Sequence, residues 1–210
     1  MQEELVFKNG LKIQWERGLD GGGSTQYRDF LKLLENKKYD HGLEWCAGLG
    51  AIGFSLLDAG ICERMSFTDI YEPSQTYIDT NAIKNNISNK VRSYITDAIS
   101  KLPSDAKFDV VVGNPPHCYN TDGLFLSKTT ARLVMDKDWL IHKEFFSNII
   151  QYLNPNGEIF LSETGPHEVL IDYAQQCGLT YKGSYPAEEL SKNSNIWACI
   201  LHFAYEKEIY

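Results

Sequence analysis

The chain has 210 residues, of which 43% are hydrophobic and 23% charged, and its net charge is −8. This length and apolar share suit one folded domain with a sizeable core and exclude a disordered or collagen-like chain. No apolar run approaches the ~20 residues that span a bilayer, and the acidic start at residues 1–4 is unlike a signal peptide. We therefore expect a cytoplasmic protein with no membrane partner, whose charge weakens non-specific binding to nucleic acid.

The cysteines argue against a structural metal or a disulfide framework. They are odd in number and show no Cys-x-x-Cys spacing: Cys46, Cys62, Cys118, Cys177 and Cys199. We expect small, buried thiols and no metal site.

The chain opens with a predicted β-hairpin. Apolar residues at 5–7 and 11–15 flank Asn9-Gly10, a pair typical of a two-residue turn because both residues tolerate positive φ. A glycine-rich stretch follows at 17–23, and Ser24 or Thr25 is the expected cap of a helix. We expect residues 1–23 to form the hairpin and residues 24–210 the rest of a single domain, with 17–27 as a segment that could cover a ligand.

From residue 42 onward the pattern alternates between strands and helices. Strands are predicted at 43–46, 65–70, 91–95, 108–112 and 158–162, and helices at 51–59, 73–86, 139–153 and 167–177. A turn at 154–157 separates the third of these helices from its strand, and two last strands, 179–185 and 196–205, follow each other without a helix. The pattern predicts an α/β, Rossmann-like fold: a mostly parallel sheet with an antiparallel last strand and helices on both faces.

A glycine loop joins the first strand of this sheet to its helix. Gly48, Gly50 and Gly53 form a G-x-G-x-x-G pattern, in which glycines let a ligand approach the backbone at a helix N-terminus. Asp69 ends the next strand, 19 residues beyond Gly50, where a carboxylate can bind both hydroxyls of a ribose. Together these features predict a cofactor that contains adenosine. Asp69 could instead cap the helix that follows it.

Two cofactor classes fit this loop. Nicotinamide dinucleotides carry a pyrophosphate, whereas S-adenosylmethionine carries a cationic sulfonium and ammonium. Glu44, four residues before Gly48, would repel a pyrophosphate but suits a cation or could organise the glycine loop. A solvated carboxylate is the simpler alternative for Glu44.

A rigid corner follows the strand at 108–112. In the run Asn114-Pro115-Pro116-His117, two prolines fix φ and bias Asn114 towards an extended conformation. The Asn114 side-chain oxygen and the Pro115 carbonyl can then act as two fixed acceptors for the hydrogens of a planar NH group. A plain proline turn is the alternative.

These motifs, over residues 42–163, resemble the class I S-adenosylmethionine-dependent methyltransferases of the Asn-Pro-Pro-aromatic branch. The resemblance implies that Asp69 binds the ribose, that Asp97 meets the adenine amine, and that Asn81 belongs to the second motif. It assigns a catalytic role to Asn114, Pro115, Pro116 and His117. It assigns cofactor contacts to Glu44, Cys46, Ala47, Gly48, Gly50, Asp69, Ile70, Asp97, Ala98 and Asn114.

Two groups within this branch are similar to the chain in different places. Protein-glutamine methyltransferases resemble it in the Gly-Ala-Ile that follows the glycine loop and at 136–146, and ribosomal-RNA guanine methyltransferases in the Gly-Leu-Asp-x-Gly at 18–22. The chain departs from the family at Cys46, which stands where a glycine is usual, and at His117, which replaces a tyrosine or phenylalanine. His117 could cover the acceptor plane or take its surplus proton.

The sequence therefore predicts an S-adenosylmethionine-dependent N-methyltransferase. The expected acceptor is an amide, amine or heteroaromatic nitrogen, with a protein glutamine or a small molecule favoured over an RNA or DNA base. The alternatives are a nicotinamide-dependent oxidoreductase and a catalytically degenerate methyltransferase fold that serves as a binding subunit.

Overall fold

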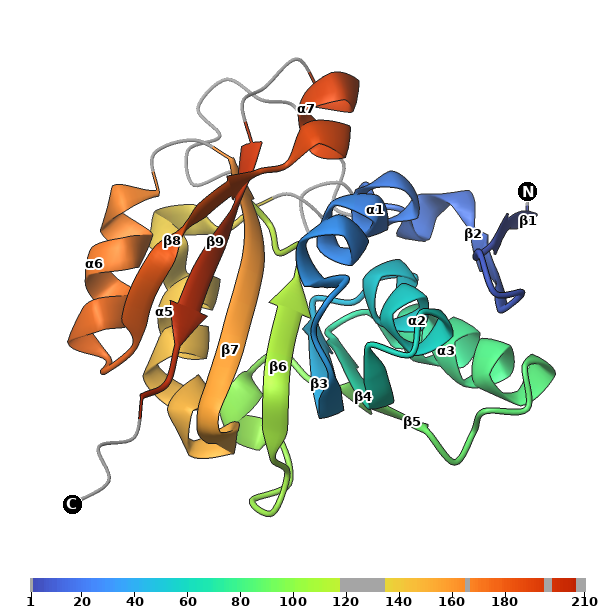
Figure 1. The fold of residues 1–210 in the computed structure, drawn as a ribbon, viewed down its shortest axis with the longest axis horizontal. Coiled ribbons are helices and arrows are strands. Elements are labelled where there is room, and N and C mark those ends of the chain that lie inside the picture. Colours follow the sequence, from blue (N-terminus) through green and yellow to red (C-terminus); the bar gives the residue numbers. More distant parts are fainter. Residues whose placement is uncertain (1, 118–134, 165–166, 195–197, 207–210) are drawn as a thin grey trace.

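A seven-stranded sheet organises the protein. The computed structural model describes residues 2–117, 135–164, 167–194 and 198–206. The strands lie in the order β5-β4-β3-β6-β7-β9-β8, and β9 runs antiparallel to both of its neighbours (Figure 1). The predicted α/β sheet with one antiparallel strand is confirmed.

The elements follow the predicted alternation closely. The strands are β1 Gln2–Val6, β2 Lys12–Glu16, β3 Tyr39–Trp45, β4 Cys62–Asp69, β5 Val91–Ile95, β6 Phe108–Gly113, β7 Leu153–Thr164, β8 Thr180–Pro186 and β9 Ala198–Ala204. The helices are α1 Gly23–Leu34, α2 Ala51–Asp58, α3 Glu72–Lys84, α5 Leu140–Ile149, α6 Glu168–Gln176 and α7 Glu188–Ser194, with short 3-10 turns at Arg17–Leu19, Ile99–Lys101, Lys137–Trp139 and Ile150–Tyr152.

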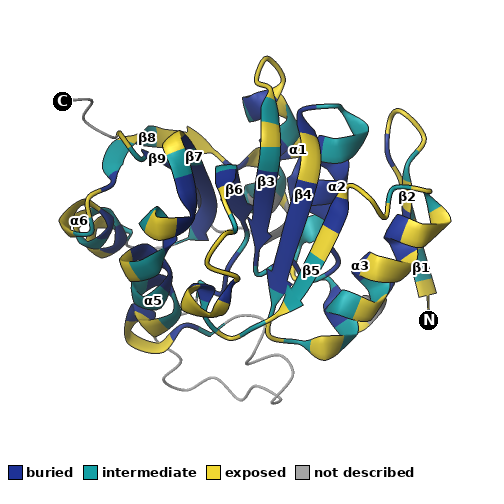
Figure 2. Ribbon diagram, turned by 90° about the horizontal axis from the view of Figure 1, so that it is seen from below, coloured by how far each residue is buried: buried dark blue, intermediate teal, exposed yellow. Residues whose placement is uncertain are grey.

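Each face of the sheet carries its own apolar core. One core joins α1, α2 and α3 to residues such as Phe67 and Val112, and the other joins α5 and α6 to residues such as Val111 and Leu161. Adjacent residues of β6 therefore serve opposite cores, as the pleat of a strand requires. The central strands are buried along most of their length, whereas the helices expose their outer faces (Figure 2). This double cover explains the nearly continuous apolar run in β6.

The N-terminal hairpin forms, but its turn differs from the two-residue turn we expected. Phe7 and Leu11 pair across three residues, and of Asn9 and Gly10 only Gly10 has a positive φ, 105°. The side chain of Asp58, at the end of α2, accepts hydrogen bonds from the backbone N–H groups of Asn9 and Leu11. This tertiary contact holds the longer turn.

Helix α1 begins on a glycine rather than on the predicted serine or threonine cap. Gly22, at φ 105°, is the N-cap, and no side chain of that residue is available to cap the helix. The carboxylate of Asp20 accepts hydrogen bonds from the N–H groups of Gly22 and Ser24, at 2.9 and 3.2 Å, and from the Ser24 hydroxyl. A carboxylate four residues upstream thus takes the role expected of Ser24 or Thr25.

The C-terminal third departs from prediction in two places. The short helix α7 lies between β8 and β9, where we expected a direct connection. The predicted turn at 154–157 is instead the irregular start of β7, where Asn156 has a φ of 64° and the register with β6 shifts. The first two residues of the predicted strand 196–205 lie outside the described residues.

Two asparagines, Asn81 in α3 and Asn85 at its C-terminal cap, bind the outer edge of β2. Asn81 accepts a hydrogen bond from the Gln14 N–H (2.9 Å) and donates one to the Gln14 carbonyl (3.0 Å). Asn85, one turn later, makes the same pair of bonds with Lys12. The side chains therefore replace a neighbouring strand and satisfy an otherwise exposed edge. Asn81 is 1% exposed and serves the hairpin here, although the resemblance placed it in a cofactor motif.

We predict that Asn81→Ala destabilises the protein by about 1–3 kcal/mol, because it leaves the Gln14 backbone groups without partners in a part-buried site. Asn85→Ala is the matched control: it removes the same two bonds at a more exposed position and should cost less. Urea unfolding followed by circular dichroism measures both. Equal losses in the two variants, both under about 0.5 kcal/mol, would show that the asparagine ladder does not hold the hairpin.

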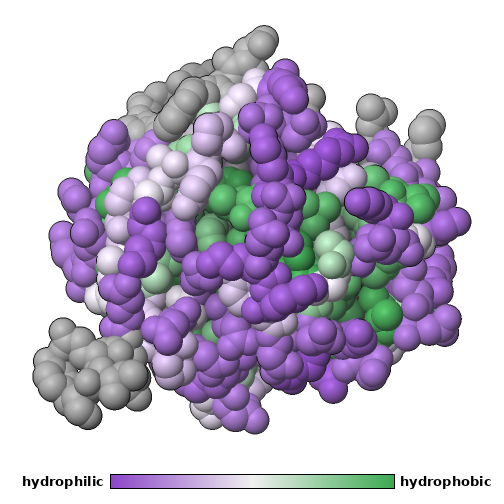
Figure 3. All heavy atoms as spheres, in the orientation of Figure 1, coloured by the Kyte–Doolittle hydropathy of each residue, from purple (hydrophilic) through white to green (hydrophobic). Residues whose placement is uncertain are grey.

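Hydrophilic residues cover most of the face seen in Figure 3, and hydrophobic residues show as patches near its middle and towards its right side. Among the described residues no helix is long and apolar enough to cross a membrane. In the same segments no group of three or more His, Cys, Asp or Glu side chains is placed to hold a metal ion.

Candidate active site

A cavity of about 390 Å³ lies at the carboxyl ends of β3, β4, β5 and β6. The described residues that line it come from the glycine segment before α1, from the four strand ends and from α5: Gly18, Leu19, Gly21, Gly23, Glu44, Trp45, Cys46, Ala47, Gly48, Leu49, Ile52, Thr68, Asp69, Ile70, Tyr71, Thr96, Asp97, Ala98, Ile99, Asn114, Pro116 and Ile141. Ligands of open parallel sheets bind at this edge.

Two carboxylates from neighbouring strands hold the glycine loop. Glu44 is 2% exposed and accepts the Gly53 N–H at 2.6 Å, while Asp69 accepts the Gly48 N–H at 2.7 Å and the Tyr71 N–H at 2.8 Å. Burial raises the pKa of Glu44 to about 8 and also raises the pKa of Asp69. Glu44 therefore organises the glycine loop, one of the roles predicted for it. It is not the solvated carboxylate that was the simpler alternative.

The backbone of the loop is bent tightly towards the cavity. Gly48 and Gly50 have φ values of 52° and 77°, and a Cβ at Gly48 would lie 3.0 Å from the Leu19 carbonyl oxygen. Cys46 also has a positive φ, 55°, which explains why a glycine is usual at this position in the similar family. Burial, followed by the nearby carboxylates, raises the pKa of the Cys46 thiol well above its ordinary value, so the thiol is neutral.

The other predicted cofactor residues lie on the same cavity. Ile70 follows Asp69 at the end of β4 and exposes 56% of its surface. Asp97 and Ala98 lie just beyond β5, and a hydrogen bond with Lys101 lowers the pKa of the Asp97 carboxyl. The fold therefore gathers nine of the ten residues that we assigned to the cofactor around one cavity, from four separate strand ends; Gly50, the N-cap of α2, is not among the lining residues.

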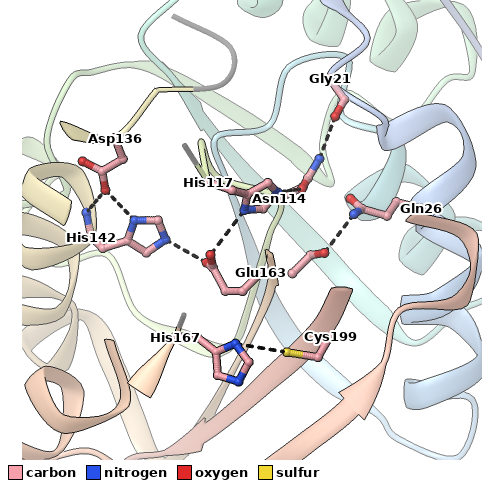
Figure 4. A network of polar contacts seen from close by, with 10 residues as sticks. Gly21, Gln26, Asn114, His117, Asp136, His142, Glu163, His167 and Cys199 are labelled. Carbon is pink, nitrogen blue, oxygen red and sulfur yellow. Dashed lines mark hydrogen bonds and ion pairs between the residues drawn. The ribbon is translucent and has the colours of Figure 1, made fainter. Parts of the chain in front are cut away.

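The Asn114 corner forms the far wall of the cavity. The Asn114 side-chain Nδ2 donates to the Gly21 carbonyl at 2.9 Å, and its Oδ1 lies 2.9 Å from His117 Nε2 (Figure 4). Pro116 lines the cavity, whereas Pro115 is buried and is not among the described lining residues. The fold thus brings Asn114 to the cavity, but both ends of the Asn114 side-chain amide already have partners, Gly21 and His117. His117 contacts Asn114 but is not among the residues that line the cavity.

A buried chain of ionisable side chains stands behind this corner. His117 Nδ1 lies 3.2 Å from Glu163 Oε2; His142 Nε2 lies 2.8 Å from Glu163 Oε1, and its Nδ1 lies 2.5 Å from Asp136 Oδ2 (Figure 4). Asp136 also accepts the backbone N–H groups of Ile141 and His142 at the start of α5. Glu163, His142 and Asp136 are each at most 1% exposed.

Mutual charge stabilises this buried chain. Burial alone would lower the pKa of His142, but the carboxylates of Glu163 and Asp136 outweigh it and raise that pKa to about 9. Burial alone would raise the pKa of Glu163, but the charges and hydrogen bonds of His142 and His117 lower it to about 2. At neutral pH the buried His142 is therefore a cation and the buried Glu163 an anion.

Sequence reasoning missed these three residues. One signal was available for Glu163: it lies at the end of an apolar strand, as Asp69 does, and carboxyl ends of parallel strands share one edge. His142 and Asp136 had only the resemblance at 136–146, because the contact of His142 with Glu163 depends on how α5 packs against β7. His167, at the start of α6, is not part of this buried chain of side chains; its Nδ1 lies 3.9 Å from the Cys199 sulfur.

The comparison with protein families bears on the identity of this fold. The model of the methyltransferase small domain matches residues 19–170, which include the glycine loop, the Asn114 corner and Glu163. The chain belongs to the methyltransferase small domain family. This membership confirms the resemblance inferred from the motifs and replaces the alternative of a nicotinamide-dependent oxidoreductase.

Curated relatives of this methyltransferase-family chain are longer proteins. It is 30% identical over 126 residues to a bifunctional methyltransferase of Rickettsia prowazekii (strain Madrid E), an alignment covering 57% of this chain and 24% of that protein. The bifunctional methyltransferase of Rickettsia typhi (strain ATCC VR-144 / Wilmington) is 29% identical over the same length. The chain thus corresponds to about a quarter of the curated relatives it matches.

Solved methyltransferases share the fold of this family member at low identity. The ribosomal protein L11 methylase of Lactobacillus delbrueckii subsp. bulgaricus superposes with a TM-score of 0.59 and 16% identity, covering 87% of this chain and 77% of that one. Trm5 of Methanocaldococcus jannaschii, solved in complex with adenosine, gives a TM-score of 0.65 and 14% identity, covering 99% and 57%. At these identities the similarity establishes the fold alone.

We predict that the free energy of unfolding falls between pH 6.5 and 9. The folded pKa of His142 lies above its unfolded value of 6.5, so its contribution is fully present below pH 6.5 and is lost as the pH rises through about 9. Glu44, raised from 4.5 to about 8, acts in the same direction. The depressed pKa of Glu163 predicts a second loss as the pH falls from 4.5 to about 2.

Urea unfolding at several pH values measures this dependence. His142→Gln should flatten the loss between pH 6.5 and 9, which we expect to be on the order of 1–3 kcal/mol in the unmodified chain. His41→Gln is the control. His41 lies near the amino end of β3, at the opposite end of that strand from the cavity, and burial lowers its pKa. A slope unchanged by His142→Gln would rule out the buried imidazolium.

Proposed function

We propose that this chain is an S-adenosylmethionine-dependent N-methyltransferase that modifies a planar amide, amine or heteroaromatic nitrogen. One observation carries the proposal. A single cavity runs from Asp69 and Asp97, suited to the adenosine of a cofactor, to Asn114, suited to an NH group. A protein glutamine or a small molecule is the favoured acceptor.

The residues present fit S-adenosylmethionine. Gly48 leaves space that a Cβ would fill, and the N–H groups of Gly48 and Gly53 are bound by Asp69 and Glu44 rather than free for a pyrophosphate. Asp69 retains lone pairs for ribose hydroxyls, since each of its oxygens accepts one backbone N–H. Ile70 and Ile99 offer apolar walls for the adenine, with Asp97 and Ala98 at its polar edge.

When bound, this cofactor supplies an electrophilic methyl group on a sulfonium. The chain supplies position and electrostatics. Asn114 Oδ1 has two lone pairs, one facing His117, so the other can accept a hydrogen from the acceptor nitrogen. The nitrogen gains positive charge as it is methylated, and a fixed oxygen dipole stabilises that charge more strongly than the neutral ground state. The roles expected for His117, covering the acceptor or taking its proton, stay predictions.

Charge favours a neutral or cationic acceptor over a phosphate backbone. Among the described residues that line the cavity none is Lys or Arg, whereas Asp69 and Asp97 are acidic. Nucleic-acid sites instead gather cationic side chains along phosphates. An RNA or DNA base, the second candidate, is supported by the resemblance at residues 18–22 to ribosomal-RNA guanine methyltransferases.

We expect S-adenosylmethionine, and not NAD, to bind the purified protein in a calorimeter. Asp69→Ala should weaken that binding at least about 10-fold, because a hydrogen-bonded charged group contributes ~1.5–3 kcal/mol. Asp40→Ala is the control, since Asp40 is an exposed carboxylate at the opposite end of β3, paired with Arg64. Unchanged affinity in Asp69→Ala would count against the ribose role.

We expect Asn114→Ala to keep cofactor affinity and to lose ~100-fold or more in methyl transfer, as single polar deletions do at other active sites. The assay transfers labelled methyl groups from S-adenosylmethionine to fractions of a cell extract. Sorting the label among protein, RNA and small molecules identifies the acceptor. Normal transfer by Asn114→Ala would remove this residue from the mechanism. Cofactor binding without transfer to any fraction would favour a binding subunit.

A further inference from the structure

A short turn after β5 has its backbone N–H groups held by a side chain from a distant helix. The 3-10 turn Ile99–Lys101 begins on Ala98, which is extended (φ −153°, ψ 138°) and has no side chain that caps the turn. The first N–H groups of a turn need an acceptor from elsewhere. Glu144, in α5, supplies it: Oε2 accepts the Ile99 N–H at 3.0 Å, and Oε1 accepts the Ser100 N–H at 3.2 Å and the Ser100 hydroxyl at 2.8 Å.

This turn forms one end of the cavity. Four consecutive residues line the cavity where we place the adenine: Thr96, Asp97, Ala98 and Ile99. The Thr96 hydroxyl donates to the Ala98 carbonyl at 2.7 Å and accepts the Ala98 N–H at 3.1 Å. Lys101, the last residue of the turn, binds Oδ1 of Asp97. A shift of the turn would therefore displace the wall of the cavity at this end.

Glu144 is itself fixed in place. Asn148, one turn later on α5, donates from its side chain to Oε1 of Glu144 at 3.2 Å and to the Glu144 carbonyl at 2.8 Å. Ile141, one turn earlier on α5, lines the cavity. Ile99 is 1% exposed and belongs to the same apolar core as the buried side of α5. Helix, carboxylate and turn therefore form one packed unit behind the adenine end of the cavity.

We propose that Glu144 is a positioning residue that holds the turn at 97–100 in the shape that receives adenine, and so sets the selectivity for a purine with a 6-amino group. The proposal rests on the proposed function, in which Asp97 accepts a hydrogen bond from that amine. Both oxygens of Glu144 face N–H donors, so a carboxylate satisfies the turn where an amide satisfies only part of it.

Loss of the carboxylate acts on binding through the shape of the turn. Without Glu144 the buried N–H of Ile99 has no acceptor, and leaving such a donor unpaired is costly. The turn then shifts towards shapes in which that N–H finds another partner. A ligand that depends on the original shape binds only the fraction of molecules that keep it. A ligand that makes no contact through the amine depends on that shape less.

The test compares two variants that each remove a carboxylate from a turn. Glu144→Ala acts beside the cavity. Asp58→Ala is the matched control, because Asp58 also accepts two backbone N–H groups of a turn, those of Asn9 and Leu11 at 2.8 and 3.0 Å. Asp58 ends α2, whereas the cavity lies at the start of that helix. Thermal melts give a temperature at which both variants are folded. If Glu144→Ala does not fold, Glu144→Gln replaces it, since glutamine keeps one oxygen for the Ile99 N–H.

The first measurement uses two ligands that differ only at the edge of the purine. S-adenosylhomocysteine carries the 6-amino group, and S-inosylhomocysteine carries an oxygen there. In a calorimeter, Glu144→Ala should bind S-adenosylhomocysteine about 10-fold more weakly and S-inosylhomocysteine less than about 3-fold more weakly, so the preference between them falls. Asp58→Ala should leave both affinities unchanged. An unchanged preference in Glu144→Ala would overturn the proposal, because a loss of stability alone does not distinguish the two ligands.

The second measurement separates binding from turnover. Methyl transfer into the labelled fraction gives the KM for S-adenosylmethionine and the kcat of each variant. Glu144→Ala should raise KM about 10-fold and keep kcat at saturating cofactor within about 2-fold, since it leaves the contacts of Asn114 in place. Asp58→Ala should change neither. A lower kcat with an unchanged KM contradicts the proposal, because the effect of Glu144 would then lie in the transfer step.

The two proposals fail separately. An unmodified chain that binds neither S-adenosylmethionine nor S-adenosylhomocysteine rejects the proposed function, whatever the variants do. If the unmodified chain binds both and Glu144→Ala binds them as tightly, the positioning role alone is rejected. An unmodified chain that binds S-adenosylhomocysteine and S-inosylhomocysteine equally well rejects the selectivity and the amine contact of Asp97, while methyl transfer stands.

Discussion

The turn between β3 and α2 depends on two carboxylates that accept its backbone N–H groups. The first N–H groups of a helix have no partner within the helix, and burying them without an acceptor is costly. Glu44 and Asp69 supply those acceptors from two adjacent parallel strands. Because the loop is held from behind by side chains of the sheet, its open side forms the wall of the cavity. The N–H groups of Gly48 and Gly53 are therefore not available to a phosphate, which matches a cofactor without one.

The opposite wall depends on a contact between segments far apart in the sequence. Asn114, after β6, binds the carbonyl of Gly21, in the glycine segment before α1. Gly113 makes this possible, since a Cβ there would lie 2.8 Å from the Trp45 carbonyl oxygen. The end of β6 can therefore pass close beside the end of β3. One side chain thus joins the glycine segment, the cavity and the buried chain of Glu163, His142 and Asp136.

Burial is what gives that chain its charges. In water a histidine between two carboxylates gains little, because solvent screens each charge. Inside the core His142 is enclosed by the rings of Trp45 and Trp139, whose centres lie 5.3 and 5.2 Å away. Removing the charge of His142 or of Glu163 alone would leave the other charge buried and unpaired, so the two charges are stable only together.

The sequence alone determined the sheet, its alternation with helices, and the residues gathered at its carboxyl edge. Period, glycine spacing and a carboxylate at a strand end are local signals, and parallel strands place their carboxyl ends together whatever the details of packing. Only the tertiary structure decided what depends on distant partners. Asp58 lengthens the hairpin turn, and α5 brings His142 to Glu163. Hydrogen bonds between segments decide these features, and no local pattern encodes a partner more than a hundred residues away, as Gln26 and Ser162 show in the core.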